Sequence, residues 1–222
     1  MKRREFLTVP VKSLGGLLLY TISGEPLRVA AQESGKVRIP LLYLTEAEAR
    51  AVQAACARIL PSDESGPGAT EANVIVYIDR QLAGPWGKDK YRYTKGPWVE
   101  SVAEHGYQAK ENPQQIYRAG IPKLGDDFAS AQPAEQDNRL RAIEKTLFFR
   151  LLRTHAIEGM FSDPLHGGNA GLIGWQLVGY PGPLMSYRDE IDKYHGMPYR
   201  AKPKSLEQVT GRKVRGMEDD RG

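Results

Sequence analysis

The fold is decided by residues 148–169, which read FFRLLRTHAIEGMFSDPLHGGN. Apolar residues recur here and just upstream at helical spacing, which predicts one long helix from Glu135 to Met160. Its expected apolar stripe consists of Leu140, Ile143, Leu147, Leu151 and Thr154, widened by Phe148, Leu152 and His155. Asp-Pro and Gly-Gly-Asn are typical of turns, so the helix is expected to end in a tight loop.

Four further helices are expected upstream of this stretch. Thr45 and Glu48 have the spacing of a capping box, which predicts a helix ending at Leu60 with Val52, Ala55, Cys56 and Ile59 on its buried face. A second helix over residues 71–82 would bury Val74, Ile75, Ile78 and Leu82, although β-branched residues there would also suit a strand. Pro113 begins a third, to about Ala119, and a short fourth covers residues 127–130.

No strand pattern is convincing anywhere, and the connection over residues 84–112 is long for a compact domain. The expected fold class is therefore mainly α: a small helical domain with long irregular loops and an extended C-terminal tail. That tail, residues 186–222, holds nine Lys or Arg and seven Asp or Glu but few large aliphatic residues. Such a composition cannot bury much surface alone, so we expect the tail to be mobile or laid along another protein.

The N-terminus has the three parts of an export signal. A basic start is followed by a modestly apolar stretch and by the small residues of Val29-Ala30-Ala31. The pattern Arg3-Arg4-Glu5-Phe6-Leu7 favours a twin-arginine signal over a general secretory signal or an ordinary amphipathic helix. We therefore expect residues 1–31 to be a signal peptide, residues 32–185 a helical domain, and the destination to be the periplasm.

Composition excludes several classes of protein. A single cysteine, Cys56, rules out an intrachain disulfide framework and a Cys-rich zinc site, and its place on an apolar face predicts a core residue. No apolar run in the 222 residues approaches the length needed to cross a bilayer. Removing residues 1–31, which hold five basic and two acidic residues, lowers the formal net charge from +4 to +1. Nucleic-acid binding thereby loses its main support.

The densest group of chemically versatile side chains is His155, Glu158, Asp163 and His166. His and Glu three residues apart share a helix face, so the four could form a metal site or hold an acid–base pair. The alternative is structural: His155 and Glu158 hydrogen-bond at the helix end, and the loop residues only make turns. We favour the structural interpretation, because the spacing is not a recognised metal pattern. The chain also lacks a nucleophile elbow, a phosphate loop, a haem-attachment motif and a flavin fingerprint.

The block from Phe148 to Asn169, followed by Gly174-Trp175 and Gly179-Tyr180-Pro181-Gly182, resembles the gluconate 2-dehydrogenase subunit 3 family. Three further segments match its pattern: residues 3–7, the loop from Leu60 to Ala69, and Gln115-Ile116-Tyr117-Arg118 with Gly120. The resemblance covers about residues 1–185. One departure is Ala156, where the family pattern has a hydroxyl residue.

The resemblance implies that the chain is not itself the catalyst. In this family, a large subunit carries FAD and oxidises sugars, sugar acids or polyols, and a cytochrome c subunit with haem c commonly passes electrons onward. The small subunit supplies the signal for the twin-arginine translocase and helps the large subunit to mature and assemble. The chain is then expected to bind no cofactor or metal itself, and to reach the membrane only through its partners. The alternatives are a free-standing periplasmic metalloenzyme using the four-residue cluster, or a solitary binding module.

On this interpretation, aromatic and loop residues are candidates for contact with the large subunit, since aromatic anchors are enriched at interfaces. The candidates are Trp86, Trp98, Phe161, His166, Asn169, Trp175 and Tyr180. The C-terminal tail is a further candidate, as a segment that wraps the partner.

Overall fold

The computed structural model describes residues 17–22, 25–30, 40–91, 96, 98, 110–184, 186, 188, 193–197 and 202–211. The chain separates into two compact units, Met1–Arg38 and Ile39–Gly222. Arg3, Arg4, Phe6 and Leu7 of the expected export signal lie outside the described residues. Among the residues that are described, no helix is long and apolar enough to span a bilayer.

The first unit contains a two-stranded antiparallel hairpin. Strand β1 (Leu17–Ile22) pairs with β2 (Glu25–Ala30), and Ile22 lies opposite Glu25. Only Ser23 and Gly24 separate the strands in sequence, a pair typical of two-residue turns. The expectation that the chain holds no strand is wrong here, because the apolar run gains ladder hydrogen bonds only with a partner segment.

The second unit is helical, as expected. Helix α1 (Glu46–Ile59) begins at the capping box, in which the Thr45 hydroxyl and the Glu48 carboxylate each accept a backbone N–H from the other residue. Helix α2 (Val74–Ala83) buries Val74, Ile75, Ile78 and Leu82, which confirms the predicted face. Helix α3 (Pro113–Gly120) starts at a second capping box, between Asn112 and Gln115. The short helix expected near residue 128 is a single 3₁₀ turn, η4 (Phe128–Ser130), after another, η3 (Ile121–Leu124).

The long helix predicted over residues 135–160 is two helices, α4 (Pro133–Ala142) and α5 (Leu147–Phe161). Thr146 causes the division, because its hydroxyl accepts the Phe149 N–H (3.2 Å) as the cap of α5 and donates to the Ile143 carbonyl (2.7 Å). The predicted stripe is correspondingly shifted. Phe148, Leu152 and His155 are buried, whereas Leu147 and Leu151 are half-buried and Thr154 is exposed.

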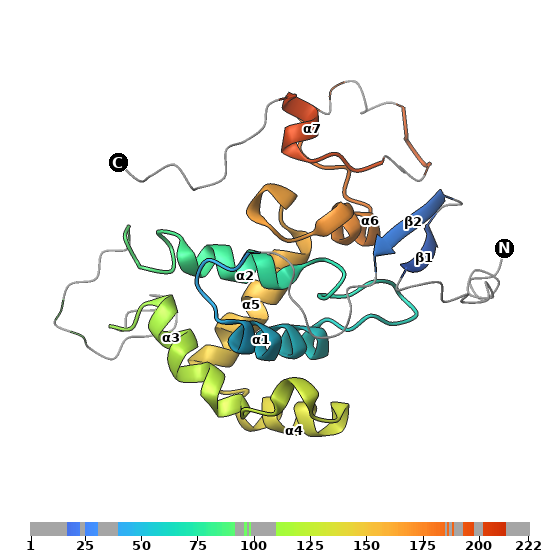
Figure 1. The fold of residues 1–222 in the computed structure, drawn as a ribbon. Coiled ribbons are helices and arrows are strands. Elements are labelled where there is room, and N and C mark those ends of the chain that lie inside the picture. Colours follow the sequence, from blue (N-terminus) through green and yellow to red (C-terminus); the bar gives the residue numbers. More distant parts are fainter. Residues whose placement is uncertain are drawn as a thin grey trace. The chain divides into compact units, whose positions relative to one another are not determined.

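Helix α5 is the centre of the second unit, where it contacts α1, α2, α3 and the short α6 (Ile173–Val178), as Figure 1 shows. Gly120 of α3 allows a close approach to α5, because a Cβ there would lie 2.0 Å from the Phe148 ring. The fully buried aliphatic and aromatic side chains of this core include Val52, Ile78, Leu82, Tyr117, Leu124, Phe128 and Leu152. Each such burial stabilises the fold by about 1.5–3 kcal/mol.

Part of the C-terminal tail folds back on its own chain. Helix α7 (Leu206–Thr210) is held by the Leu206 N–H, which donates to Asp163 Oδ2 (2.7 Å), and by the Lys204 N–H, which donates to the Pro181 carbonyl (3.1 Å). Residues 202–211 are therefore linked to the loop after α5 by these two hydrogen bonds, and the expectation that the tail wraps a partner stays a prediction.

Candidate functional site

His155 and Glu158 sit on α5, facing two tyrosines from neighbouring helices. His155 Nδ1 and the Tyr117 hydroxyl of α3 share a hydrogen bond of 2.8 Å, and the Tyr77 hydroxyl of α2 donates to Glu158 Oε2 at 2.9 Å. The Tyr117 ring stacks on His155 at 16°, and Trp86 meets the imidazole edge-on with ring centroids 4.7 Å apart. The two α5 side chains therefore join three segments of the fold.

This aromatic surround sets the charge state of His155. Burial lowers the pKa of His155 to about 4, so the imidazole is neutral at pH 7. Burial also raises the pKa of the Tyr117 hydroxyl far above its ordinary value. The pair is thus a neutral hydrogen bond inside the core, which suits a structural role.

The lowered pKa predicts acid sensitivity of the fold. Because His155 binds its proton far more readily in the unfolded chain, stability is full above the ordinary pKa near 6.5 and declines as the pH falls toward 4. The free energy of unfolding is expected to be about 2 kcal/mol lower at pH 5 than at pH 7. Urea denaturation followed by circular dichroism at both pH values measures this difference.

A variant pair assigns that loss to one residue. In His155→Phe/Tyr117→Phe, which removes both hydrogen-bonding partners, the difference between pH 7 and pH 5 should nearly vanish. In His166→Asn, which removes a histidine from the loop after α5, it should persist. An unchanged difference in the double variant would refute this assignment.

The loop after α5 turns back tightly on the helix. Gly168 and Gly174 allow this, since a Cβ at either would lie about 2 Å from a backbone carbonyl of α5, that of Gly159 or Met160. Asn169 occupies the left-handed region (φ 48°), accepts the Gly174 N–H (2.9 Å) and donates to the Ser162 carbonyl (2.8 Å). These contacts explain the Gly-Gly-Asn sequence, because the loop backbone lies close against the backbone of α5.

Asp163 links the same loop to the tail. Its Oδ1 accepts the Leu165 N–H (3.1 Å) at the start of η5 (Pro164–His166), while its Oδ2 accepts the Leu206 N–H. The four residues of the metal hypothesis thus go to different partners. Within the described part of the chain, no group of three or more His, Cys, Asp or Glu side chains is placed to hold a metal ion. The geometry supports the structural interpretation of the cluster.

The candidate interface residues divide by exposure. Trp86 and Trp98 are 41% exposed and Tyr180 is 40% exposed, while Phe161 and His166 are half-buried. Asn169 and Trp175 are buried in the single chain, and their role as contact residues stays a prediction. Asn169 ties the loop together as described, and the Trp175 indole N–H donates to the Phe161 carbonyl at 2.6 Å.

A shallow apolar depression lies at the end of α6. We call it the α6 hollow: a space of about 310 Å³ lined by Phe161, Trp175, Val178 and Tyr180. Trp175 and Tyr180 pack edge-to-face, with ring centroids 4.9 Å apart. Val178 is 62% exposed and was not among the candidates from the sequence. Its position three residues after Trp175, on the same face of a helix, could have indicated that it belongs to this group.

Cys56 lies inside the core, as predicted, with 1% of its surface exposed. Burial raises the pKa of its thiol to about 12. The nucleophilic thiolate is therefore scarce at neutral pH.

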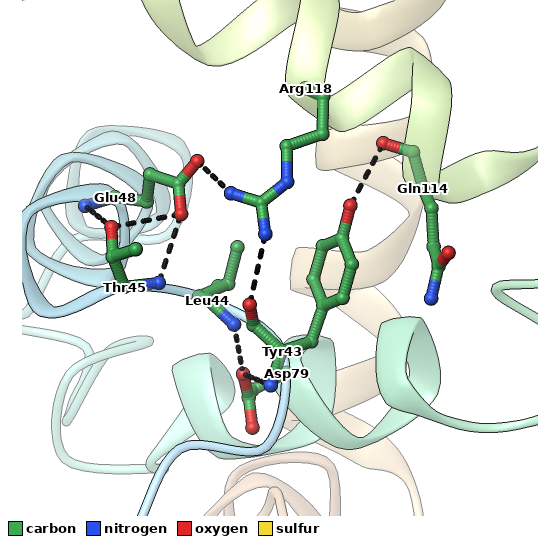
Figure 2. A network of polar contacts seen from close by, with 7 residues as sticks. All are labelled: Tyr43, Leu44, Thr45, Glu48, Asp79, Gln114 and Arg118. Carbon is green, nitrogen blue, oxygen red and sulfur yellow. Dashed lines mark hydrogen bonds and ion pairs between the residues drawn. The ribbon is translucent and has the colours of Figure 1, made fainter.

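Sequence reasoning also missed a polar network at the start of the second unit, shown in Figure 2. Asp79 of α2 is 1% exposed, and its carboxylate accepts the N–H groups of Leu42 (2.6 Å), Tyr43 (3.0 Å) and Leu44 (2.8 Å). Arg118 of α3 donates to the Tyr43 carbonyl (3.0 Å) and pairs with Glu48. Although burial opposes it, the hydrogen bonds from Arg118 and Thr45 lower the pKa of Glu48, so both partners of this pair are charged.

The fold and the site define a small helical domain. The side chains of His155, Glu158 and Asp163 form hydrogen bonds within the chain, and an apolar hollow lies at the end of α6. The chain belongs to the gluconate 2-dehydrogenase subunit 3 family, whose model matches residues 46–182. This confirms the resemblance seen in the sequence, and the family's name describes one subunit of a multi-subunit dehydrogenase. No curated protein and no solved structure matches the chain.

Proposed function

We propose that this chain is the non-catalytic small subunit of a flavin-dependent dehydrogenase complex acting on sugars, sugar acids or polyols. A separate large subunit carries FAD and the substrate site, and haem c belongs to a cytochrome subunit where one is present. The observation that carries the proposal is the family match over residues 46–182.

The hydrogen bonds made by the four-residue cluster support a non-catalytic role. His155, Glu158 and Asp163 are each engaged in a hydrogen bond to another segment of the same chain. A catalytic acid or base needs an open path to substrate, which the buried His155 lacks. In addition, the α6 hollow is lined by apolar side chains, which fits a partner's apolar group better than a charged cofactor such as a flavin diphosphate.

The N-terminal sequence supports a role in export. We propose that Arg3 and Arg4 direct the chain to the twin-arginine translocase, which carries folded proteins to the periplasm. A flavin loaded in the cytoplasm requires such a route, because the large subunit must fold around it before transport. The chain would then escort its partner and stay with it at the periplasmic face of the membrane, held there by the partners.

The α6 hollow is the proposed contact with the large subunit. Val178→Asp should abolish co-purification of the two chains, because a charge buried without a partner costs about 2–4 kcal/mol, or roughly 30- to 1,000-fold in affinity. Val178 is largely exposed, so the isolated variant should unfold at the same urea concentration as the wild type.

The matched control is Ala134→Asp, which places the same charge at an exposed position in the first turn of α4. Affinity is measured by titrating the purified small subunit into the flavin-carrying subunit. Unchanged affinity of Val178→Asp for the large subunit would show that the hollow is not part of the interface. The escort role would then still be tested by measuring export.

A further inference from the structure

The backbone of residues 42–45 is held by two carboxylates, and Figure 2 shows the contacts of Tyr43, Leu44 and Thr45. Asp79 accepts the N–H groups of Leu42, Tyr43 and Leu44, and Glu48 accepts the Thr45 N–H at 2.9 Å. Four consecutive backbone donors are thus engaged outside any helix or sheet. A segment bonded in this way cannot adopt a new backbone pairing without first breaking these contacts.

Arg118 closes the other side of the segment. Its guanidinium donates to the Tyr43 carbonyl, lies 4.4 Å from the centroid of the Tyr43 ring and pairs with Glu48. The Tyr43 hydroxyl donates to the Gln114 carbonyl at 3.2 Å. We call this arrangement of Asp79, Glu48 and Arg118 around residues 42–45 the Asp79–Arg118 clamp; it draws on α1, α2 and α3.

Burial couples the clamp to folding of the helical unit. A carboxylate that is 1% exposed is costly unless its hydrogen-bonding capacity is filled, and the three N–H groups fill it. Residues 42–44 therefore leave Asp79 only at the expense of an uncompensated buried charge. The clamp forms when α1, α2 and α3 come together, and it strengthens their association.

The clamp lies directly downstream of the boundary between the two units, which falls between Arg38 and Ile39. A peptidase binds its substrate as an extended strand, using the backbone N–H and C=O groups around the bond it cuts. We propose that the Asp79–Arg118 clamp sets the downstream limit of leader removal: processing occurs upstream of Leu42, and the bonds within residues 41–45 are protected in the folded chain. That a leader is removed rests on the proposed export function.

Limited proteolysis of the purified full chain tests the clamp itself. Thermolysin cuts before large apolar residues, and N-terminal sequencing of the products reports cleavage before Leu42, Tyr43 and Leu44. In the wild type these bonds should survive as long as the bond before buried Leu152. Asp79→Asn, which presents an amide N–H to the backbone donors, should speed cleavage at the three bonds about tenfold, with no change before Leu152.

Two further variants keep the test decisive. Asp127→Asn, which alters an exposed carboxylate paired with Arg139, should behave as the wild type. If circular dichroism shows that Asp79→Asn does not fold, Arg118→Ala replaces it in the test, because this substitution opens only the exposed side of the clamp. Cleavage before Leu44 is then expected to be about threefold faster than in the wild type. Wild-type cleavage before Leu42, Tyr43 or Leu44 as rapid as cleavage before the exposed Met197, or no acceleration in the folded variants, would overturn the proposal. The purified chain alone is used, so failure here is distinct from failure of the escort function.

Discussion

Replacing Asn169 by Ala is expected to lower the free energy of unfolding by about 3 kcal/mol. The side chain is fully buried, accepts the Gly174 N–H and donates to the Ser162 carbonyl. Alanine leaves both groups without a partner and does not favour the left-handed conformation (φ 48°) that Asn169 adopts. The loop after α5 would lose the residue that ties its two ends together. Urea denaturation at pH 7 measures the change.

The matched control is Asn138→Ala on α4, where the side chain is exposed and accepts only from Arg141. That substitution should change the free energy of unfolding by less than about 0.5 kcal/mol. If Asn169→Ala were equally mild but impaired binding of the large subunit, Asn169 would be a contact residue after all, and the structural explanation of the Gly-Gly-Asn sequence would be wrong.

Replacing both Arg3 and Arg4 by Lys is expected to leave this chain and its flavin-carrying partner in the cytoplasm. Lysine keeps the charge but not the planar guanidinium group, so a receptor that recognises paired arginines should reject it. The periplasmic fraction of both proteins, measured by immunoblotting of fractionated cells, should fall by more than about tenfold. Arg28→Lys, which changes the remaining arginine of the expected signal, should export normally.

The helices of the second unit were predictable because their signals are local. Capping boxes, proline at a helix start and apolar periodicity all act within a few residues, and α1, α2 and α3 appear where these signals place them. The break between α4 and α5 was missed because apolar spacing continues through it. Only the Thr146 hydroxyl, which bonds both Ile143 and Phe149, marks the division.

The other features that the sequence did not reveal are contacts between segments of the chain. Asp79 bonds residues 35 to 37 positions upstream, so nothing near it in sequence indicates its role. Asn169 and Trp175 have side chains suited to an interface, but backbone groups of the same loop and of α5 engage them. The β1–β2 hairpin likewise depends on pairing, which an apolar run does not reveal. The family, by contrast, was recognisable from a contiguous block of residues.

Whether this chain escorts a catalytic partner is tested most directly by measuring the flavin-loaded large subunit in the periplasm with and without the small subunit. Cells expressing both chains should show flavin fluorescence and dye-linked dehydrogenase activity in the periplasmic fraction. Cells lacking this chain should lose both signals there, and cells with Arg3→Lys/Arg4→Lys should retain the flavin-loaded partner in the cytoplasm. A large subunit that is exported, flavin-loaded and fully active without this chain would contradict the escort function.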